Sequence, residues 1–505
     1  MAAYCIGRAA ATRPSAQALV VVHDAAATAP AEVWTFAQLQ EAVLRIAGVL
    51  KASGLAPGAR ILIRLENTST YALLFFGAIA GGFVPLPTSA QLTEHEVLFL
   101  LEDSGAEAIA IGDTLSLSTL PGELQVFTAG DIGQMIMKGE RQTYADTAAN
   151  DPAFLIYTSG TTDAPKGVLH AQRSAFGRRP MYQGWYGIVP EDRMLHAGAF
   201  NWTYTLGTGL TDPWANGATA IIYTGEKEPA LWPRLIAQTG ATLFAAVPGL
   251  YRQILKYAKP TRTDLGALRH GLVAGETPPR GLFEDWATET GTQLYEALGM
   301  SEISTYVSSS PSVPRKAGAV GKPQAGRRVA ILPLEEGTEP LGPGEDGLLA
   351  VHRSDPGLML SYWNRPEEEA HVFRGDWFIG GDLAVMDEMG YVTHLGRTND
   401  LMNALGYRVS PLEVEAVLVD HPHVAEVGCA ETVVRDGVSV IAAFIVPAVG
   451  VQPDAVEIQR FAAERLAPYK RPREIVVVDT LPRTANGKLM RSLLKHPGGS
   501  NTAKT

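Results

Sequence analysis

Apolar residues recur at helical spacing within residues 35–55 and predict a helix there: Leu39, Val43, Ile46 and Leu50. The apolar run at 60–65 that follows predicts a short buried strand. Further helices and strands are expected in alternation at 71–80, 231–238, 242–247, 280–290 and 293–297. Strands separated by helix-length segments indicate mostly parallel sheets flanked by helices, so we expect an α/β fold.

The pattern changes near residues 396–400, where short helices and strands of a separate group begin. They are expected at 411–419, 424–429, 438–446, 454–466 and 474–478. This part of the chain has enough apolar positions to form a small α+β domain of its own. We therefore predict a large N-terminal domain at 1–398 and a small C-terminal domain at 399–505.

Composition indicates a large globular protein, because the 505 residues are 46% apolar and 19% charged. No stretch approaches the roughly 20 apolar residues of a membrane span, and the N-terminus lacks a secretory signal. We therefore expect a cytoplasmic protein. The formal net charge of −11 argues against nucleic acid as a main partner. Cys5 and Cys429 are the two cysteines, and their spacing indicates neither a disulfide framework nor a zinc site.

The segment from Tyr157 to Gly167 combines the features of a phosphate-binding loop. A strand-like run at 154–157 leads into hydroxyl-bearing residues and glycine, and Lys166 follows. Glycine lets backbone N–H groups turn toward an anion, hydroxyls add donors, and lysine adds a positive charge. The P-loop of mononucleotide-binding ATPases is excluded, because Pro165 stands where its second glycine belongs. Taken alone, these residues also suit a solvated polar turn.

The letters YTSGTTDAPKG resemble the phosphate-binding signature of the adenylate-forming superfamily, which includes acyl-CoA synthetases, peptide-synthetase adenylation domains and firefly luciferase. Asp163 stands where that superfamily usually has glycine. Further segments resemble the later motifs of the superfamily in the same order, at 275–277, 295–302, 378–382, 396–397 and 482–491. The resemblance therefore covers the whole chain.

The resemblance implies an ATP site to which all of these segments contribute. Within it, Asp382 would accept the ribose hydroxyls, Arg397 would donate to the ribose, and Glu302 would hold Mg²⁺. Lys488 would enter the site for adenylation and act there with Lys166 and Glu302. The implied ATP-binding residues are Thr158, Ser159, Gly160, Thr161, Thr162, Lys166, Gly275, Glu276, Thr277, Glu296, Ala297, Leu298, Gly299, Met300, Ser301, Asp382, Arg397 and Lys488.

The implied reaction has two steps. The acid carboxylate attacks the α-phosphorus of ATP, while the lysines and Mg²⁺ offset the repulsion between the two anions. The thiol of CoA then displaces AMP, after the C-terminal domain has rotated. Asn399 would be the hinge, in a position where most relatives carry aspartate, and Gly406 would line the tunnel for the pantetheine chain of CoA.

The resemblance places an acid pocket among residues from three segments: Phe200, Asn201, Trp202, Ala274, Gly299 and Met300. Acetate-specific relatives carry tryptophan at the position of Gly299, so glycine indicates room for a larger acid. The stretches 273–276 and 320–323 look most like those of benzoate-type and medium-chain acyl-CoA ligases. We therefore expect an aromatic, alicyclic or short-to-medium-chain acid. Core packing is the alternative role of the aromatic residues.

Two other functions stay open. An adenylating enzyme could load the phosphopantetheine of a carrier protein, although no carrier domain is expected after residue 505. A catalytically silent binding protein is the second alternative, against which the retained Lys488, Glu302 and Asp382 argue. Zinc-protease, dinucleotide-binding and hydrolase signatures do not occur in the sequence. The expected partners are a small carboxylic acid, ATP and CoA, and we expect a monomer or homodimer.

Overall fold

The computed structural model describes residues 1–27, 29–115, 117–118, 120, 122, 124–158, 165–279, 281–404, 407–435, 438–483 and 489–494. It divides into two compact units. The first comprises Met1–Val329 with Val351–Phe378, and the second comprises Ala330–Ala350 with Ile379–Thr505. The α/β class expected from the sequence is confirmed. No helix among the described residues is long and apolar enough to span a membrane.

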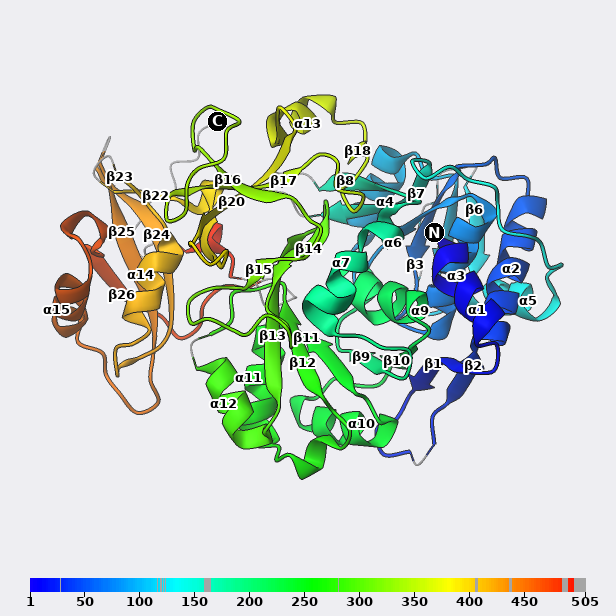
Figure 1. Ribbon diagram of the computed structural model, residues 1–505, viewed down its shortest axis with the longest axis horizontal. Helices are drawn as coiled ribbons and strands as arrows, with labels where there is room; N and C mark the ends of the chain where they lie inside the picture. Colours follow the sequence, from blue (N-terminus) through cyan, green and yellow to red (C-terminus); the bar gives the residue numbers. More distant parts are fainter. Residues whose placement is uncertain are drawn as a thin grey trace. The chain divides into compact units, whose positions relative to one another are not determined.

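In the described part of the first unit, nine strands form a large sheet whose middle is parallel (Figure 1). The order is β15 (Lys322–Pro323), β14 (Ser304–Ser308), β13 (Gln293–Met300), β12 (His270–Ala274), β11 (Leu243–Ala246), β9 (Arg193–His196), β10 (Thr219–Tyr223), β1 (Gln17–Val22) and β2 (Glu32–Thr35). Strands β2, β14 and β15 are antiparallel to their neighbours at the two edges. The carboxyl ends of the parallel strands thus meet at one edge, where ligand sites of such sheets usually form.

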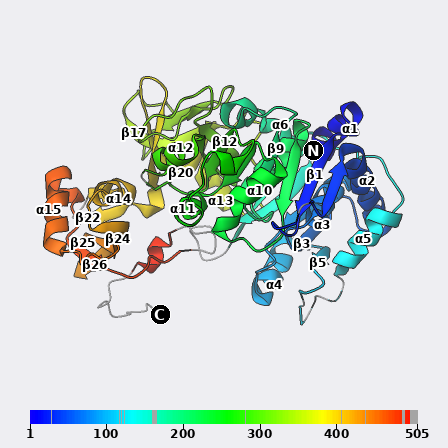
Figure 2. The same cartoon turned by 90° about the horizontal axis from the view of Figure 1, so that it is seen from below.

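A second sheet, wholly parallel, has the order β4 (Val84–Pro87), β3 (Arg60–Arg64), β5 (Ala108–Ile111) and β6 (Gln125–Thr128). Helices α2 (Phe36–Ala52) and α3 (Ser69–Gly81) share one apolar core with β1 and β10 of the large sheet and with β3 and β5 of the second. The two helices lie side by side in both views (Figures 1 and 2). Because α3 is apolar all round, it is buried on every side between the sheets.

A local signal explains where α2 begins. The hydroxyl of Thr35 accepts the N–H of Gln38, whose side chain reaches back to the N–H of Thr35, so this reciprocal cap starts α2 at Phe36. The helix predicted within 35–55 is confirmed. Other helices of the first unit are α1 (Arg8–Thr12), α4 (Glu94–Ser104), α5 (Ala129–Lys138), α6 (Ser174–Gly177), α7 (Arg179–Met181), α8 (Thr203–Leu206), α9 (Asp212–Ala215), α10 (Trp232–Thr239), α11 (Pro248–Tyr257), α12 (Leu282–Thr290) and α13 (Pro366–Val372).

A small antiparallel sheet, which the sequence pattern did not indicate, has the order β18 (Ser361–Tyr362), β8 (Lys166–Ala171) and β7 (Pro152–Thr158). Thr158 lies opposite Lys166 at the open end of the β7–β8 pair. The connection between these strands is too short for the crossover that parallel strands need, so the pair must be antiparallel. The strand expected at 154–157 is confirmed as part of β7.

A further sheet has the order β16 (Val329–Leu332), β17 (Asp346–His352), β20 (Trp377–Met386) and β19 (Phe373–Arg374), and β21 (Val392–Arg397) pairs with β20. The units place residues 330–350 and 379–398 with the C-terminal part of the chain, because β20 and β21 are joined along their length. The predicted boundary at residue 398 concerns which residues rotate as one domain, and it stays a prediction.

The C-terminal part of the second unit has its own core. Strands β24 (Val424–Arg435), β25 (Val438–Pro447) and β26 (Glu474–Val477) form a sheet, and β22 (Met402–Ala404) pairs with β23 (Tyr407–Val409). Helices α14 (Pro411–Leu418) and α15 (Ala455–Arg465) pack on it through one apolar cluster. These elements confirm the small α+β fold. Cys429 lies in this core and Cys5 in the core of the first unit, both as free thiols.

Candidate active site

Lys166 stands at the open end of the β7–β8 hairpin. Its ammonium group forms an ion pair with Glu368 of α13 and lies 5.8 Å from the ring centre of Tyr362. The lysine is only partly exposed, so both contacts hold its charge beside the hairpin. The residues that connect the strands, among them Ser159, Gly160, Thr161, Thr162 and Asp163, lie outside the described residues.

Glu302 follows β13 in the turn that leads to β14. The hydroxyl of Tyr362 donates to its carboxylate oxygen Oε1 at 2.7 Å, and the N–H of Met359 donates to its backbone carbonyl at 2.7 Å. Lys166 also contacts Tyr362, so the structure brings these two predicted catalytic residues together around one tyrosine. Their roles in catalysis stay predictions.

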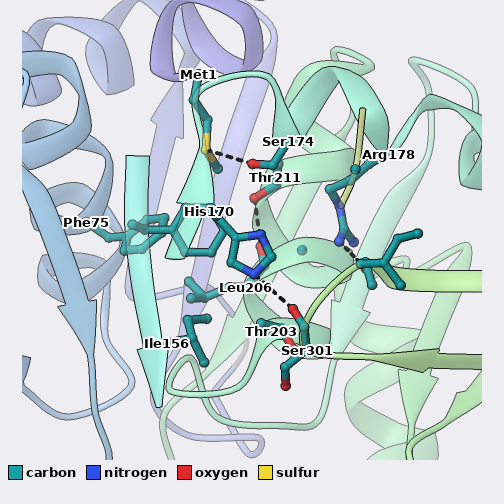
Figure 3. A pocket seen from close by; sticks show the side chains of 15 residues that line it. Met1, Phe75, Ile156, His170, Ser174, Arg178, Thr203, Leu206, Thr211 and Ser301 are labelled. Carbon is teal, nitrogen blue, oxygen red and sulfur yellow. Dashed lines mark hydrogen bonds between the residues drawn. The ribbon is translucent and has the colours of Figure 1, made fainter. Parts of the chain in front are cut away.

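Ser301, next to Glu302, is held through its backbone. His170 on β8 lies 2.8 Å from the carbonyl oxygen of Ser301 (Figure 3). Because a carbonyl can only accept, Nε2 of His170 carries the proton, and Nδ1 has no hydrogen-bond partner among the described residues. Burial lowers the pKa of His170 to about 4, and Arg178 adds to the shift. The imidazole is therefore neutral near pH 7.

Ser304 is held through its side chain, and its φ of +75° is unusual for a residue with a Cβ. Arg178 donates to the Ser304 hydroxyl and forms two hydrogen bonds to the carboxylate of Asp212, at 2.8 and 2.7 Å. Tyr186 donates to the same carboxylate at 2.7 Å. Burial opposes the charge of Arg178, but Asp212 outweighs that effect and holds the arginine pKa above its ordinary value. The turn from 301 to 304 is thus fixed at both ends.

A cavity of about 30 Å³ lies among His170, Arg178, Ser301 and Ser304 (Figure 3). Phe75, Ile156 and Leu206 supply much of its apolar lining (Figure 3). This volume holds about one water molecule. The cavity is therefore too small to be the predicted pocket for a carboxylic acid.

Predicted acid-pocket residues and predicted ATP-binding residues lie together at the end of β12. Ala274 ends the strand and is buried, and Gly275 follows with a φ of +97°. A Cβ on Gly275 would come within 3.0 Å of the Trp202 ring, so glycine lets that ring pack over the strand end. Glu276 and Thr277 follow in an irregular segment and are more exposed.

Phe200 lies in a different environment from Trp202. It packs against Tyr71 of α3 with ring centres 5.6 Å apart, inside the core between the two sheets. Trp202 and Ala274 belong to another apolar cluster, and Asn201 is half-buried. For Phe200 the structure thus displays the core packing named as the alternative. A place for Phe200 in the acid pocket stays a prediction.

Strand β13 carries the predicted ATP-binding run from Glu296 to Met300, beside β12. Ala297 lies opposite Ala274 in the parallel pair, which brings the two motifs to the same edge, and Leu298 and Met300 are half-buried. A Cβ on Gly299 would come within 2.4 Å of the Ser304 carbonyl oxygen. Glycine therefore lets the backbone of β14, which bulges at this point, lie close to residue 299, and the room expected there for a larger acid stays a prediction.

Glu296 combines two backbone contacts with an unusual acidity. Its N–H donates to the hydroxyl of Ser309 at 2.9 Å, and its carbonyl accepts the Ser309 N–H at 2.9 Å. Loss of water around the carboxyl group raises the pKa of Glu296 to about 8, against which Arg315 acts. The carboxyl group is therefore largely protonated at pH 7.

Asp382 and Arg397 meet in the second unit, where β20 and β21 pair the two residues directly. Oδ1 of Asp382 accepts from Arg397 at 3.2 Å and from His394 at 3.1 Å. Burial would raise the pKa of Asp382, but its contacts with His394 and Arg397 lower it below the usual value. Oδ2 is buried and has no hydrogen-bond partner among the described residues. An ionised carboxylate with one spare oxygen suits the predicted ribose contact.

The remaining predicted residues lie near the C-terminal end. Asn399 lies in a short 3₁₀ turn, Thr398–Asp400, directly after β21. Gly406 and Lys488 lie outside the described residues. After the Lys488 segment, Arg491 forms a part-buried ion pair with Glu415 of α14, and the longer of the two contacts is 2.9 Å.

Two family models match the chain. The model for AMP-binding enzymes matches residues 6–363, and that for the C-terminal domain of AMP-binding enzymes matches residues 413–488. The chain belongs to the AMP-binding enzyme family.

Named members of the AMP-binding enzyme family match nearly the whole chain. Benzoate–CoA ligase of Thauera aromatica is 31% identical over 92% of this chain and 90% of its own. The mitochondrial acyl-coenzyme A synthetase ACSM3 of Rattus norvegicus is 29% identical over 93% of this chain and 85% of its own. A solved benzoate CoA ligase from Burkholderia xenovorans LB400 is 29% identical, with a TM-score of 0.86 over 98% and 99% of the two chains. This AMP-binding enzyme is accordingly an acid–thiol ligase.

The geometry adds residues to this AMP-binding enzyme that sequence reasoning missed. Tyr362, His170, Arg178 and Asp212 support the turn that carries Ser301 and Glu302, and His394 supports Asp382. Tyr362 is 60 positions from its partner Glu302, and Arg178 is 34 positions from Asp212. No local motif signals such pairs. A buried arginine can be suspected from an apolar neighbourhood, but its partner cannot.

Proposed function

We propose that this AMP-binding enzyme joins CoA to an aromatic, alicyclic or short-to-medium-chain carboxylic acid through an acyl-adenylate. The convergence of Lys166 and Glu302 on Tyr362, beside the hairpin that leads into the 159–164 segment, carries the proposal. A cation and a hard oxygen ligand at this place suit a triphosphate and its divalent metal ion. The names of the relatives, a benzoate–CoA ligase and an acyl-coenzyme A synthetase, support the choice of acid and thiol.

In the first step, a carboxylate oxygen of the acid attacks the α-phosphorus of ATP, and the bond to pyrophosphate breaks. Lys166 and Lys488 would stabilise the negative charge on the phosphates. This stabilisation becomes stronger in the transition state, where the charge on the departing pyrophosphate grows. Glu302 would hold Mg²⁺, which when bound offsets further charge at the phosphate oxygens. Asp382 would accept a ribose hydroxyl through its spare oxygen Oδ2.

In the second step, the thiol of CoA attacks the acyl carbon, and AMP leaves with the bonding electron pair. We place the hinge for the change between the steps at Asn399, in the turn directly after Arg397. Gly406 would give the pantetheine chain a close approach to the backbone. In this proposal residues 399–505 move as the small domain.

The acid would bind next to the end of β12, where Trp202 packs over Gly275 and Ala274 is buried. An apolar wall with one large ring suits an aromatic or alicyclic acid or a short acyl chain. Gly299 and Met300 would lie nearby on β13, which is hydrogen-bonded to β12.

The test uses the purified protein with ATP, Mg²⁺ and a panel of carboxylic acids. The proposal predicts that one class of acid causes pyrophosphate release and an equal loss of CoA thiol. Pyrophosphate release without thiol loss for every acid would instead favour transfer to a carrier protein. ATP binding without pyrophosphate release for any acid would favour a silent binding protein.

Lys488→Ala separates the two steps. We expect it to abolish adenylation, because the entering positive charge is lost, while CoA transfer from a preformed acyl-adenylate stays largely intact. Pyrophosphate exchange measures the first step, and single-turnover thioester formation measures the second. Equal loss of both steps would contradict the role assigned to Lys488.

A further inference from the structure

Tyr362 has no role in the proposed mechanism, although it lies beside two of the residues that do. It lies on β18, which pairs with β8 so that Tyr362 is opposite Val168. The N–H of Trp363, the next residue, donates to the carbonyl of Gly167 at 2.8 Å. The backbone of this tyrosine is thus fixed directly beside Lys166, and its side chain is buried.

The segment that contains Tyr362 holds Glu302 at two separate atoms. The N–H of Met359 donates to the Glu302 carbonyl, and the Tyr362 hydroxyl donates to Oε1 of the carboxylate, both at 2.7 Å. Two contacts from one short segment fix both the position of the residue and the rotation of its carboxylate. The hydroxyl must be the donor, because an ionised carboxylate only accepts.

We propose that Tyr362 is a positioning residue for ATP-bound Mg²⁺, which orients the Glu302 carboxylate and ties it to Lys166. The inference rests on the proposed function, in which Glu302 holds the metal ion. With Oε1 accepting from the hydroxyl, Oε2 would be left to bind the ion. Carboxylates that ligate metals are commonly fixed by such hydrogen bonds, and loss of the supporting group typically costs about 10–100-fold in metal affinity or activity.

The aromatic ring and the hydroxyl have separable roles. The ring packs beside Lys166, whose ammonium lies 5.8 Å from its centre, whereas the hydroxyl alone reaches Glu302. Tyr362→Phe therefore removes the contact to the carboxylate and leaves the ring in place. The variant should fold like the wild type, and thermal unfolding checks this.

The experiment is a calorimetric titration of the full-length protein with ATP at a series of Mg²⁺ concentrations. We expect Tyr362→Phe to raise the half-saturating Mg²⁺ concentration about tenfold and to leave ATP binding in EDTA unchanged. Tyr144→Phe is the matched control, because it removes a part-buried hydroxyl that contacts Gln40 elsewhere in the first unit. The control should keep the Mg²⁺ dependence of the wild type.

A double-variant cycle gives an independent readout. In a Glu302→Gln background, Tyr362→Phe should cause no further change in Mg²⁺ dependence, because the two groups act through one contact. Full additivity of the two effects, or unchanged Mg²⁺ dependence in Tyr362→Phe, would overturn the inference alone. Absence of Mg²⁺-dependent ATP binding in the wild type would overturn the proposed function as well.

Discussion

Two ion pairs in the first unit differ in how completely the protein surrounds them. The Arg178–Asp212 pair is nearly inaccessible, with side chains 9% and 0% exposed, and Asp212 also accepts from Tyr186. The Lys166–Glu368 pair is 20% and 30% exposed and stands at the open end of a hairpin. A fully surrounded pair has no room to exchange partners, whereas a part-exposed pair can release its cation to an arriving phosphate. Under the proposed mechanism, burial thus separates the charge that supports the site from the charge that acts in it.

The largest effect is expected from Arg178→Met, which leaves the carboxylate of Asp212 buried without its cation. Removing one partner of a buried pair costs about 3–5 kcal/mol of stability. Urea unfolding followed by tryptophan fluorescence should report this loss as an earlier transition.

A double variant tests whether the unpaired charge of Asp212 causes the loss of stability in Arg178→Met. Arg178→Met combined with Asp212→Leu removes both charges and should recover much of the lost stability. A double variant no more stable than Arg178→Met would mean that packing, and not the ion pair, holds this region.

Lys166→Met should reduce activity strongly and stability only slightly, the reverse of Arg178→Met. Removal of a group that stabilises developing charge lowers kcat by about 10²–10³-fold, which pyrophosphate exchange measures. Its part-exposed ion pair contributes only about 0–1 kcal/mol to stability. A loss of stability as large as that of Arg178→Met would place Lys166 with the supporting charges instead.

Glu368→Gln should increase the affinity for ATP slightly. In this variant Lys166 no longer has to break its ion pair with residue 368 before it can bind a phosphate. Breaking such a part-exposed pair costs about 0–1 kcal/mol. ATP affinity, measured by titration, should therefore rise up to about fivefold. Glu367→Gln, the same charge change on an exposed neighbour in α13, is the control and should have no such effect.

The smallest and most gradual effect concerns the pH dependence of stability and the carboxyl group of Glu296, whose pKa burial raises against the opposing charge of Arg315. Its pKa is raised from 4.5 to about 8, so the folded protein keeps a proton that the unfolded chain loses. Its contribution to stability is therefore complete below about pH 4.5 and declines as pH rises to about 8.

Glu296→Gln should remove this dependence, because glutamine resembles the protonated acid and does not titrate. The difference between the thermal unfolding midpoints of variant and wild type should shift in favour of glutamine from pH 5 to pH 8, and then level off. A constant difference across that range would mean that Glu296 is already ionised in the folded protein.

Local signals in the sequence were sufficient for much of the fold. The apolar spacing of α2 and the alternation of helices with strands gave the α/β class correctly. The antiparallel β18–β8–β7 sheet was not indicated, because β18 comes from a segment nearly 200 positions away from its partner β8, as the pairing of Ser361 with Leu169 shows. Periodicity reports which face of a strand is buried, and it does not report the partner strand.

The candidate site was predictable where a motif is continuous in sequence. Lys166 and Glu302 were found from such motifs, and the structure brings both to Tyr362. Gly299 was predicted to leave room for a larger acid; the structure shows that glycine admits the bulged backbone of β14 at this point, and the room for the acid stays a prediction. Tyr362 itself was missed, because one hydroxyl that supports a distant carboxylate leaves no local pattern.

The two buried cysteines make the units separately observable. Cys5 lies in the first unit and Cys429 in the second, and burial raises the pKa of Cys5 to about 12 and that of Cys429 well above its ordinary value. Reagents that attack thiolates should therefore reach each sulfur only when its own unit opens. Labelling rates at the two sites would time the unfolding of each unit within one sample. In the native protein, the same reagents would count free CoA with little background from the enzyme.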